Sequence, residues 1–185
     1  MLGQSPSQTV GPFFHYGLIH GKENILINEQ TAGQHIDLKG YVFDGDGAPV
    51  PDALIEIWQA DAQGFFNHPA DPNQAKADPN FRSFGRSATV NGGQFYFRTV
   101  KPGAIPGMPT PYINVRIFSR GMLIHIFTRL YFADEPGNAD DPVLNNVPAE
   151  RRPTLIARRE DTQDVLTYRF DIRLQGQGET VFFNP

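Results

Sequence analysis

The sequence predicts an all-β protein, a β-sandwich of short strands joined by tight turns and two long loops. Short segments in which hydrophobic and polar residues alternate recur along the chain, as expected for strands with one buried face. The 18 glycines and 16 prolines are scattered between these segments, which favours many turns over disorder. Only residues 142–160 have helical character, and Pro148 and Pro153 limit it to short pieces.

The first three expected strands are separated by recognisable turns. Ile36–Phe43 alternates hydrophobic and polar residues, and Asp44–Gly47 after it is a turn signal of the Asp-Gly type. Ala53–Ala60 is the second strand. Asn91–Gly93 is another turn, and Gln94–Val100 follows it as the third strand.

The second half of the chain is expected to contain a hairpin and two further strands. Ile113–Phe118 and Ile124–Phe132 flank a turn at Ser119–Met122. Val165–Leu174 and Thr180–Phe183 then complete a set of about seven strands. Strands at this density favour a sandwich.

The 185 residues fit one domain, which we place at residues 36–185 after an N-terminal segment of residues 1–35. This segment and residues 64–85 are expected to be long loops, which in compact domains are usually functional or cover something.

Composition excludes several classes of function. The net charge of −4 without a basic stripe argues against a nucleic-acid partner, and the lack of cysteine removes disulfides and thiolate chemistry. No signal peptide is visible, and no apolar run approaches the ~20 residues that span a bilayer, so a cytoplasmic location is expected. Neither a phosphate-binding glycine loop nor a Gly-x-Ser-x-Gly elbow occurs.

Four segments in a fixed order carry a resemblance: Ile55–Gly64, Lys101–Gly107, Thr110–Val115 and Thr128–Asp134. They resemble the intradiol ring-cleavage dioxygenases, a family that binds ferric iron through two tyrosines and two histidines. Three further segments resemble the branch formed by the iron-free α subunits of this family: Ser5–His15, Phe84–Arg86 and Arg169–Phe183.

The resemblance implies a complex in which a β subunit holds the ferric iron and this chain does not. Such a complex opens the ring of protocatechuate with dioxygen, giving 3-carboxy-cis,cis-muconate in aromatic catabolism by the β-ketoadipate pathway. The α subunit shapes the pocket of its partner and supports a higher αβ oligomer.

The four positions that match the iron ligands of the family lack the required donors. Phe66 and Ile105 stand where the family has its two tyrosines, and Tyr112 and Asn114 stand where it has its His-x-His pair. Ferric iron prefers anionic oxygen and imidazole ligands. We therefore expect no metal in this chain.

Arg129 lies in a segment whose period of two puts His125, Phe127 and Tyr131 on the same face. The pattern fits either an arginine stacked on neighbouring rings or a fixed positive charge directed at an anion. The resemblance implies the second, because the equivalent arginine of α subunits lines the substrate cavity of the neighbouring β chain.

The stretch from Thr9 to Phe13 reads by itself as a turn in a mobile terminus. The resemblance implies instead that residues 1–35 wrap onto the β subunit, where Thr9, Gly11, Pro12 and Phe13 form one wall of its pocket. The family often has tyrosine where Phe13 stands, so a hydrogen bond from that hydroxyl is missing here.

His125 is the only histidine expected inside a strand, and with no second histidine two residues away it fits a core or interface position. Two alternative functions stay open. One is a self-sufficient iron dioxygenase with other ligands, which the missing His-x-His argues against. The other is a free-standing transthyretin-like or carbohydrate-binding β-sandwich without catalysis, which would leave the aromatic face around Arg129 without a partner.

Overall fold

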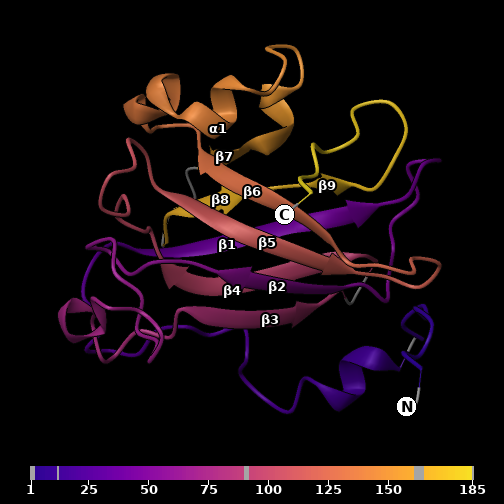
Figure 1. Ribbon diagram of the computed structural model, residues 1–185, viewed down its shortest axis with the longest axis horizontal. Coiled ribbons are helices and arrows are strands. Elements are labelled where there is room, and N and C mark those ends of the chain that lie inside the picture. Colours follow the sequence, from indigo (N-terminus) through magenta and orange to yellow (C-terminus); the bar gives the residue numbers. More distant parts are fainter. Residues whose placement is uncertain (1–2, 12, 90–91, 161–164, 185) are drawn as a thin grey trace.

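The computed structural model describes residues 3–11, 13–89, 92–160 and 165–184, and in this part the chain is mostly strand. The strands form one curled sheet in the order β3-β2-β5-β6-β7-β8-β1-β4, with β9 beside β1 (Figure 1). The strands are β1 (His35–Phe43), β2 (Leu54–Trp58), β3 (Phe84–Ala88), β4 (Gln94–Val100), β5 (Tyr112–Phe118), β6 (Ile126–Phe132), β7 (Ile156–Glu160), β8 (Thr167–Arg169) and β9 (Ile172–Arg173). The helical pieces are α1 (Pro142–Asn145) and the 3-10 turns η1 (Phe14–Gly17), η2 (Gln74–Lys76), η3 (Pro136–Asp140) and η4 (Arg152–Leu155). The expected all-β fold is confirmed.

The core lies between two halves of the curled sheet, β3-β2-β5-β6 and β7-β8-β1-β4. Every second side chain of the central strands points inward and is fully buried, and these residues include Ile36, Leu38, Ile55, Ile57, Phe97, Ile113, Val115 and Leu130. The edge strands β3 and β4 approach each other, and the Tyr96 amide donates to Ser87 Oγ at 3.1 Å. The parallel pairing of β6 with β7 joins the halves, and a second parallel pairing, of β1 with β8, lies within the second half.

A small second cluster covers one end of the side of β6 that faces away from the core. Tyr131 is fully buried there against Leu144, Val147 and Leu155 from the segment that contains α1 and η4 (Figure 1, above β6 and β7). Asp141 organises the cover, because its Oδ1 accepts from the Leu144 amide at 2.8 Å and from the Tyr131 hydroxyl at 3.0 Å. It is thus both the N-cap of α1 and the anchor of Tyr131.

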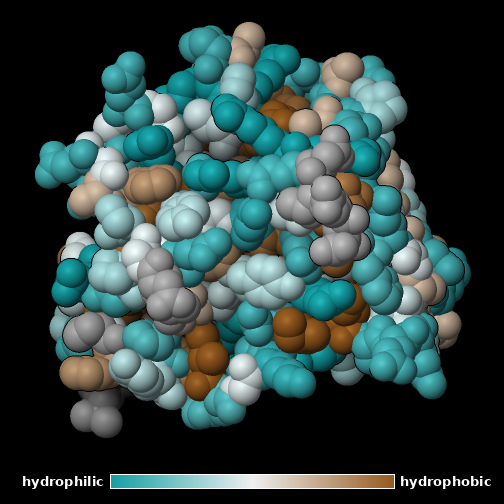
Figure 2. Space-filling model, turned by 180° about the vertical axis from the view of Figure 1, so that it is seen from behind, coloured by the Kyte–Doolittle hydropathy of each residue, from teal (hydrophilic) through white to brown (hydrophobic). Residues whose placement is uncertain are grey.

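Residues 24–31 pack on the domain. Leu26 is 1 % exposed, and its amide donates to the Arg98 carbonyl at 2.8 Å beside β4. Seen from behind, the molecule is largely hydrophilic with small separate hydrophobic patches (Figure 2). No helix within the described ranges is long and apolar enough to cross a membrane.

The strands expected near the start of the chain and the hairpin are present, but the expected boundaries need correction around His125. β6 begins at Ile126, so His125 lies outside it, whereas His35 opens β1. The His125 ring instead packs edge-on against Phe127 at 4.7 Å, in the turn of the hairpin.

Two strands were missed by the sequence-based prediction. β3 lies where the 64–85 loop was expected to end and pairs with β2 over five residues, with Gly85 at a point where a Cβ would meet the Leu26 side chain at 2.5 Å. β7 lies in the segment with helical character, because pairing with β6 and β8 overrides the local preference.

The C-terminal strands are shorter than expected. The predicted strand at 165–174 is broken into β8 and β9, because the Tyr41 amide donates to the side chain of Asp171 at 3.1 Å in place of a ladder bond. The predicted strand at 180–183 is reduced to an isolated bridge between Phe127 and Phe183.

Candidate functional site

The positions matched to the family's histidines lie on the side of the β2-β5-β6 half that faces away from the core, called the outer face below. Asn114 of β5 is directly opposite Trp58 of β2 and Arg129 of β6, and Tyr112 is directly opposite Tyr131. Directly opposite residues share a face, so all five side chains project to the same side.

The loops that carry the other two positions meet beside this face. The Phe66 ring stacks nearly parallel on Trp58, with 5.4 Å between centroids and 4° between planes. Gly64, with φ of +88°, comes so close to the backbone of Ala104 and Ile105 that no Cβ would fit. The four segments that carry the family resemblance therefore lie together beside the outer face.

The residues at these positions do not fit a ferric iron. Phe66 and Ile105 have no donor atom, and Asn114 offers only a neutral amide. Tyr112 has a phenol, but its ring face is occupied by the Arg129 guanidinium, whose Cζ lies 4.1 Å from the ring centroid. Among the described residues no group of three or more histidine, cysteine or acidic side chains could hold a metal.

Arg129 is the most unusual charge of the outer face. Its Nη1 atom is buried without a hydrogen-bond partner, and no described carboxylate lies within ion-pair distance of it. Burial raises the pKa of Tyr131 to about 12, although a side-chain hydrogen bond from Arg129 and the positive charge of Arg129 both act to lower it. The structure thus presents an uncompensated cation where the cover over Tyr131 ends.

The neighbouring cations of this face are compensated. Glu56, with 7 % of its surface exposed, accepts from Arg86 Nε at 2.7 Å and lies 3.8 Å from Arg116. Glu56 and Arg116 border a pocket of about 190 Å³ together with the rings of Trp58, Phe84 and Phe127. Arg86 and Arg116 therefore have a carboxylate nearby, whereas Arg129 has none among the described residues.

The N-terminal segment lies at the other end of the hairpin. Thr9 Oγ1 accepts from the Gly121 amide at 2.8 Å, and the Gly11 carbonyl accepts from the Phe14 amide at 3.0 Å. Phe13 is 76 % exposed, and Pro12 lies outside the described residues.

This end of the hairpin is rich in exposed apolar surface. Leu123 and Ile124 are 62 % and 72 % exposed and, with Ser7, Gln8 and Val10, border a pocket of about 330 Å³. About 14 Å of strand separates this turn from the pair formed by Asn114 and Arg129. The structure of this chain therefore does not bring the N-terminal residues into contact with Arg129.

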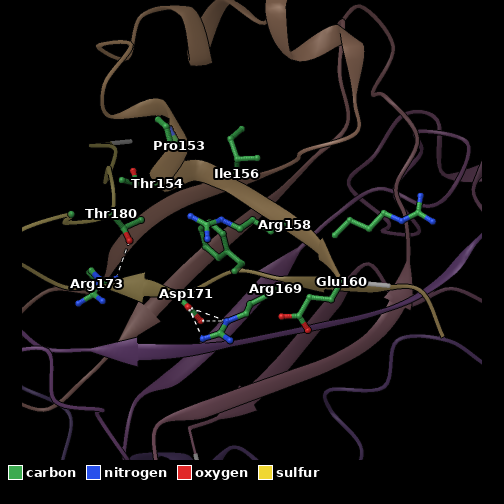
Figure 3. A pocket seen from close by; sticks show the side chains of 12 residues that line it. Pro153, Thr154, Ile156, Arg158, Glu160, Arg169, Asp171, Arg173 and Thr180 are labelled. Carbon is green, nitrogen blue, oxygen red and sulfur yellow. Dashed lines mark hydrogen bonds and ion pairs between the residues drawn. The ribbon is translucent and has the colours of Figure 1, made fainter. Parts of the chain in front are cut away.

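A larger pocket of about 630 Å³ on β7, β8 and β9 was not anticipated from the sequence (Figure 3). Its arginines come from β7, β8 and β9, and much of its charge is paired: Arg169 with Asp171 at 2.9 Å, and Glu160 with Lys39 at 2.9 Å. The Arg173 guanidinium packs over the Phe43 ring at 4.9 Å. These contacts are typical of a charged surface and supply no further catalytic chemistry.

Comparison with known proteins gives consistent matches over nearly the whole chain. A family model described as dioxygenase matches residues 10–176. The protocatechuate 3,4-dioxygenase alpha chain of Pseudomonas putida is 44% identical, covering 100% of this chain and 98% of its own length; that of Burkholderia cepacia is 47% identical over 99% and 98%.

The similarity extends to a second kind of chain and to solved structures. The protocatechuate 3,4-dioxygenase beta chain of Burkholderia cepacia is 36% identical over 85% of this chain and 72% of its own. The dioxygenase domain of a dioxygenase carbohydrate-binding protein fusion from Streptomyces sp. SirexAA-E superposes with a TM-score of 0.67, with 27% identity over 83% of this chain and 87% of that one.

Proposed function

This chain belongs to the intradiol dioxygenase family, and we propose that it serves there as the iron-free α chain of a two-chain protocatechuate 3,4-dioxygenase. The observation that carries the proposal is the outer face itself. It has the strand arrangement of the family, and Phe66, Ile105, Tyr112 and Asn114 stand at the positions that we match to the iron ligands. A chain with this frame and without these donors needs a second chain for the chemistry.

The partner that we propose is a β chain that holds the ferric iron. Similarity to both α and β chains supports this arrangement, since the two kinds of chain are then related folds that have divided the work. The complex opens the ring of protocatechuate between its two hydroxylated carbons with dioxygen, yielding 3-carboxy-cis,cis-muconate. Reading the chain as a free-standing binding sandwich is not favoured by full-length similarity to dioxygenase chains.

Within the complex, the contribution of this chain is to shape and charge the partner's pocket. We propose that residues 1–35 wrap onto the β chain and that Thr9, Gly11, Pro12 and Phe13 form part of the pocket wall. The exposed apolar surface around Phe13, described above, supports an interface there, because such surface is typical of obligate contacts.

Arg129 has the electrostatic role in this proposal. A guanidinium without a carboxylate partner among the described residues can meet the carboxylate or the catecholate oxygens of protocatechuate in the partner's pocket. There it orients the ring and stabilises negative charge. The chain itself carries out no bond-making step.

Co-expression with a β chain tests the proposal. The two chains should copurify in equal amounts, with iron and with the visible absorption that tyrosinate-to-iron charge transfer produces. This chain purified alone should be colourless and free of stoichiometric iron after exposure to ferrous salts and air. Stoichiometric iron with that colour in the isolated chain, or a failure of the two chains to associate, would contradict the proposal.

A further inference from the structure

The side chain of Arg129 does not contact its direct cross-strand partner but a diagonal one. Asn114 is opposite Arg129, whereas the guanidinium lies over the ring of Tyr112, two residues earlier on β5. Long side chains reach such diagonal neighbours across an antiparallel pair. Arg129 therefore leans along the sheet toward the covered end of the outer face.

The ring beneath the guanidinium is well supported. Tyr112 lies 6.1 Å from the ring of Tyr131, its direct cross-strand partner, and packs against the cluster that contains Leu144 and Leu155. Tyr131 and Asp141 are both fully buried and joined through the phenolic hydroxyl. The aromatic platform is thus fixed by a buried hydrogen bond rather than standing alone on the surface.

The contact with Tyr112 holds the guanidinium without using its hydrogen-bond donors. A cation over a ring face is held by the ring quadrupole, so the contact with Tyr112 itself uses none of the five N–H groups, although the guanidinium also interacts with the Tyr131 hydroxyl. One of the nitrogens, Nη1, has no acceptor among the described residues although it is buried. This chain covers Nη1, so an acceptor from outside meets the guanidinium at the part of the Arg129 side chain that stays half-exposed.

We propose that Tyr112, at a position where the family has an iron-ligating histidine, is a positioning residue for Arg129. Its ring orients the guanidinium so that the half-exposed Arg129 side chain faces an oxyanion outside this chain. The inference rests on the proposed function and names the oxyanion as the carboxylate or phenolate oxygens of the substrate held by the β chain. In this proposal, the position that holds a ligand in the family holds Arg129 in place in this chain.

The test measures substrate binding in the αβ complex without turnover. Protocatechuate is titrated anaerobically into complexes that contain wild-type chain, Tyr112→Leu, Tyr112→Phe, Arg129→Ala or the double variant Tyr112→Leu/Arg129→Ala. Iron content and sedimentation of each complex serve as controls for assembly. Phenylalanine keeps the ring and is the matched control for leucine, which removes it.

The expected pattern is specific to positioning. Tyr112→Leu should raise Kd about three- to thirtyfold, the range of a partly desolvated cation–π contact, and Tyr112→Phe should stay within about twofold of wild type. In the Arg129→Ala background, removal of the ring should have no further effect, because Tyr112 acts through Arg129. In steady-state kinetics the same Tyr112→Leu complex should lose kcat/KM by a similar factor.

Other outcomes overturn the inference, and they can be told apart. Wild-type affinity of Tyr112→Leu beside weak binding of Arg129→Ala would show that Arg129 needs no platform. Multiplying effects in the double variant would show that Tyr112 acts independently. Wild-type affinity of Arg129→Ala would remove the role of Arg129 itself, while copurification with the β chain would still support the proposed function.

Arg129→Lys covers the case in which Tyr112→Leu does not assemble. Lysine keeps the positive charge but lacks the planar guanidinium that stacks on a ring and presents a fixed nitrogen. The lysine complex should therefore bind protocatechuate nearly as weakly as Arg129→Ala. Wild-type affinity of the lysine complex would refute positioning by Tyr112.

Discussion

Replacing Arg129 by alanine should leave the stability of the isolated chain nearly unchanged but lower kcat/KM of the complex. In the chain alone, the change removes a cation–π contact of about 0.5–1 kcal/mol and also a buried donor whose lack of an acceptor costs about 1–3 kcal/mol. The free energy of unfolding of the isolated chain should therefore stay within about 1 kcal/mol of wild type, or rise. Urea denaturation followed by fluorescence measures it.

In the complex, the same substitution should be costly. Loss of a charge-assisted contact to the substrate is worth about 1.5–3 kcal/mol, or roughly a ten- to hundredfold decrease in kcat/KM for protocatechuate. Iron content and assembly should not change. The loss should be smaller for catechol if the contact is to the carboxylate, and about equal if it is to the reacting oxygens.

Arg116→Ala is the matched control for Arg129→Ala. Arg116 lies on the same outer face and packs over the Phe127 ring at 4.7 Å, but it lies near Glu56 and its side chain is 43% exposed. Arg116→Ala should therefore leave kcat/KM of the complex near the wild-type value. The reasoning is refuted if Arg129→Ala keeps wild-type kinetics with both substrates, or if it unfolds the isolated chain.

Three further predictions concern stability and association. Asp141→Ala should lower the free energy of unfolding by about 2–4 kcal/mol in urea denaturation, because it removes the cap of α1 and the acceptor of Tyr131. Asp140→Ala, at the exposed neighbouring residue, should change this free energy little. Equal effects of the two substitutions would contradict the role of Asp141. Burial raises the pKa of Tyr131 from 10.0 to about 12, so the contribution of the neutral phenol to stability is complete below pH 10 and is lost as the pH rises toward 12. Tyr131→Phe should therefore flatten the fall of the free energy of unfolding between pH 10 and 12. An unchanged pH dependence would count against a buried neutral phenol. The isolated chain should self-associate through its exposed apolar turn, so the double variant Leu123→Ser/Ile124→Ser should shift sedimentation toward the monomer. Unchanged association would show that the surface responsible for self-association lies elsewhere.

The fold class was predictable from the sequence because alternation and turn residues agree in the first half of the chain and in the hairpin. β3 and β7 were not predictable from local pattern. Each is short and gains its structure from neighbouring strands, as the charged stretch Ile156–Glu160 does between β6 and β8. The break between β8 and β9 depends on a contact of Asp171 with Tyr41, which lies far away in the sequence.

The candidate site was partly predictable for a similar reason. The alternation of β6 correctly placed Arg129 on a face with aromatic residues, and its cross-strand partners were then set by the register of the hairpin. The diagonal contact with Tyr112 and the buried, unpartnered Nη1 need atomic positions, because they depend on the direction in which the arginine leans. The roles of Thr9, Gly11, Pro12 and Phe13 in a partner's pocket stay predictions.

The parallel pairing of β1 with β8 sets the order in which this chain can become competent for assembly. Asp37 pairs with Thr167, and at ribosomal speeds of about 5–20 residues per second the roughly 130 residues between them take about 6–26 s to synthesise. Throughout that time one edge of β1 has no partner strand and is open to chaperones or to mispairing with another nascent chain. Closure of the sheet by β8 therefore comes late in synthesis, and the open edge of β1 needs protection until then.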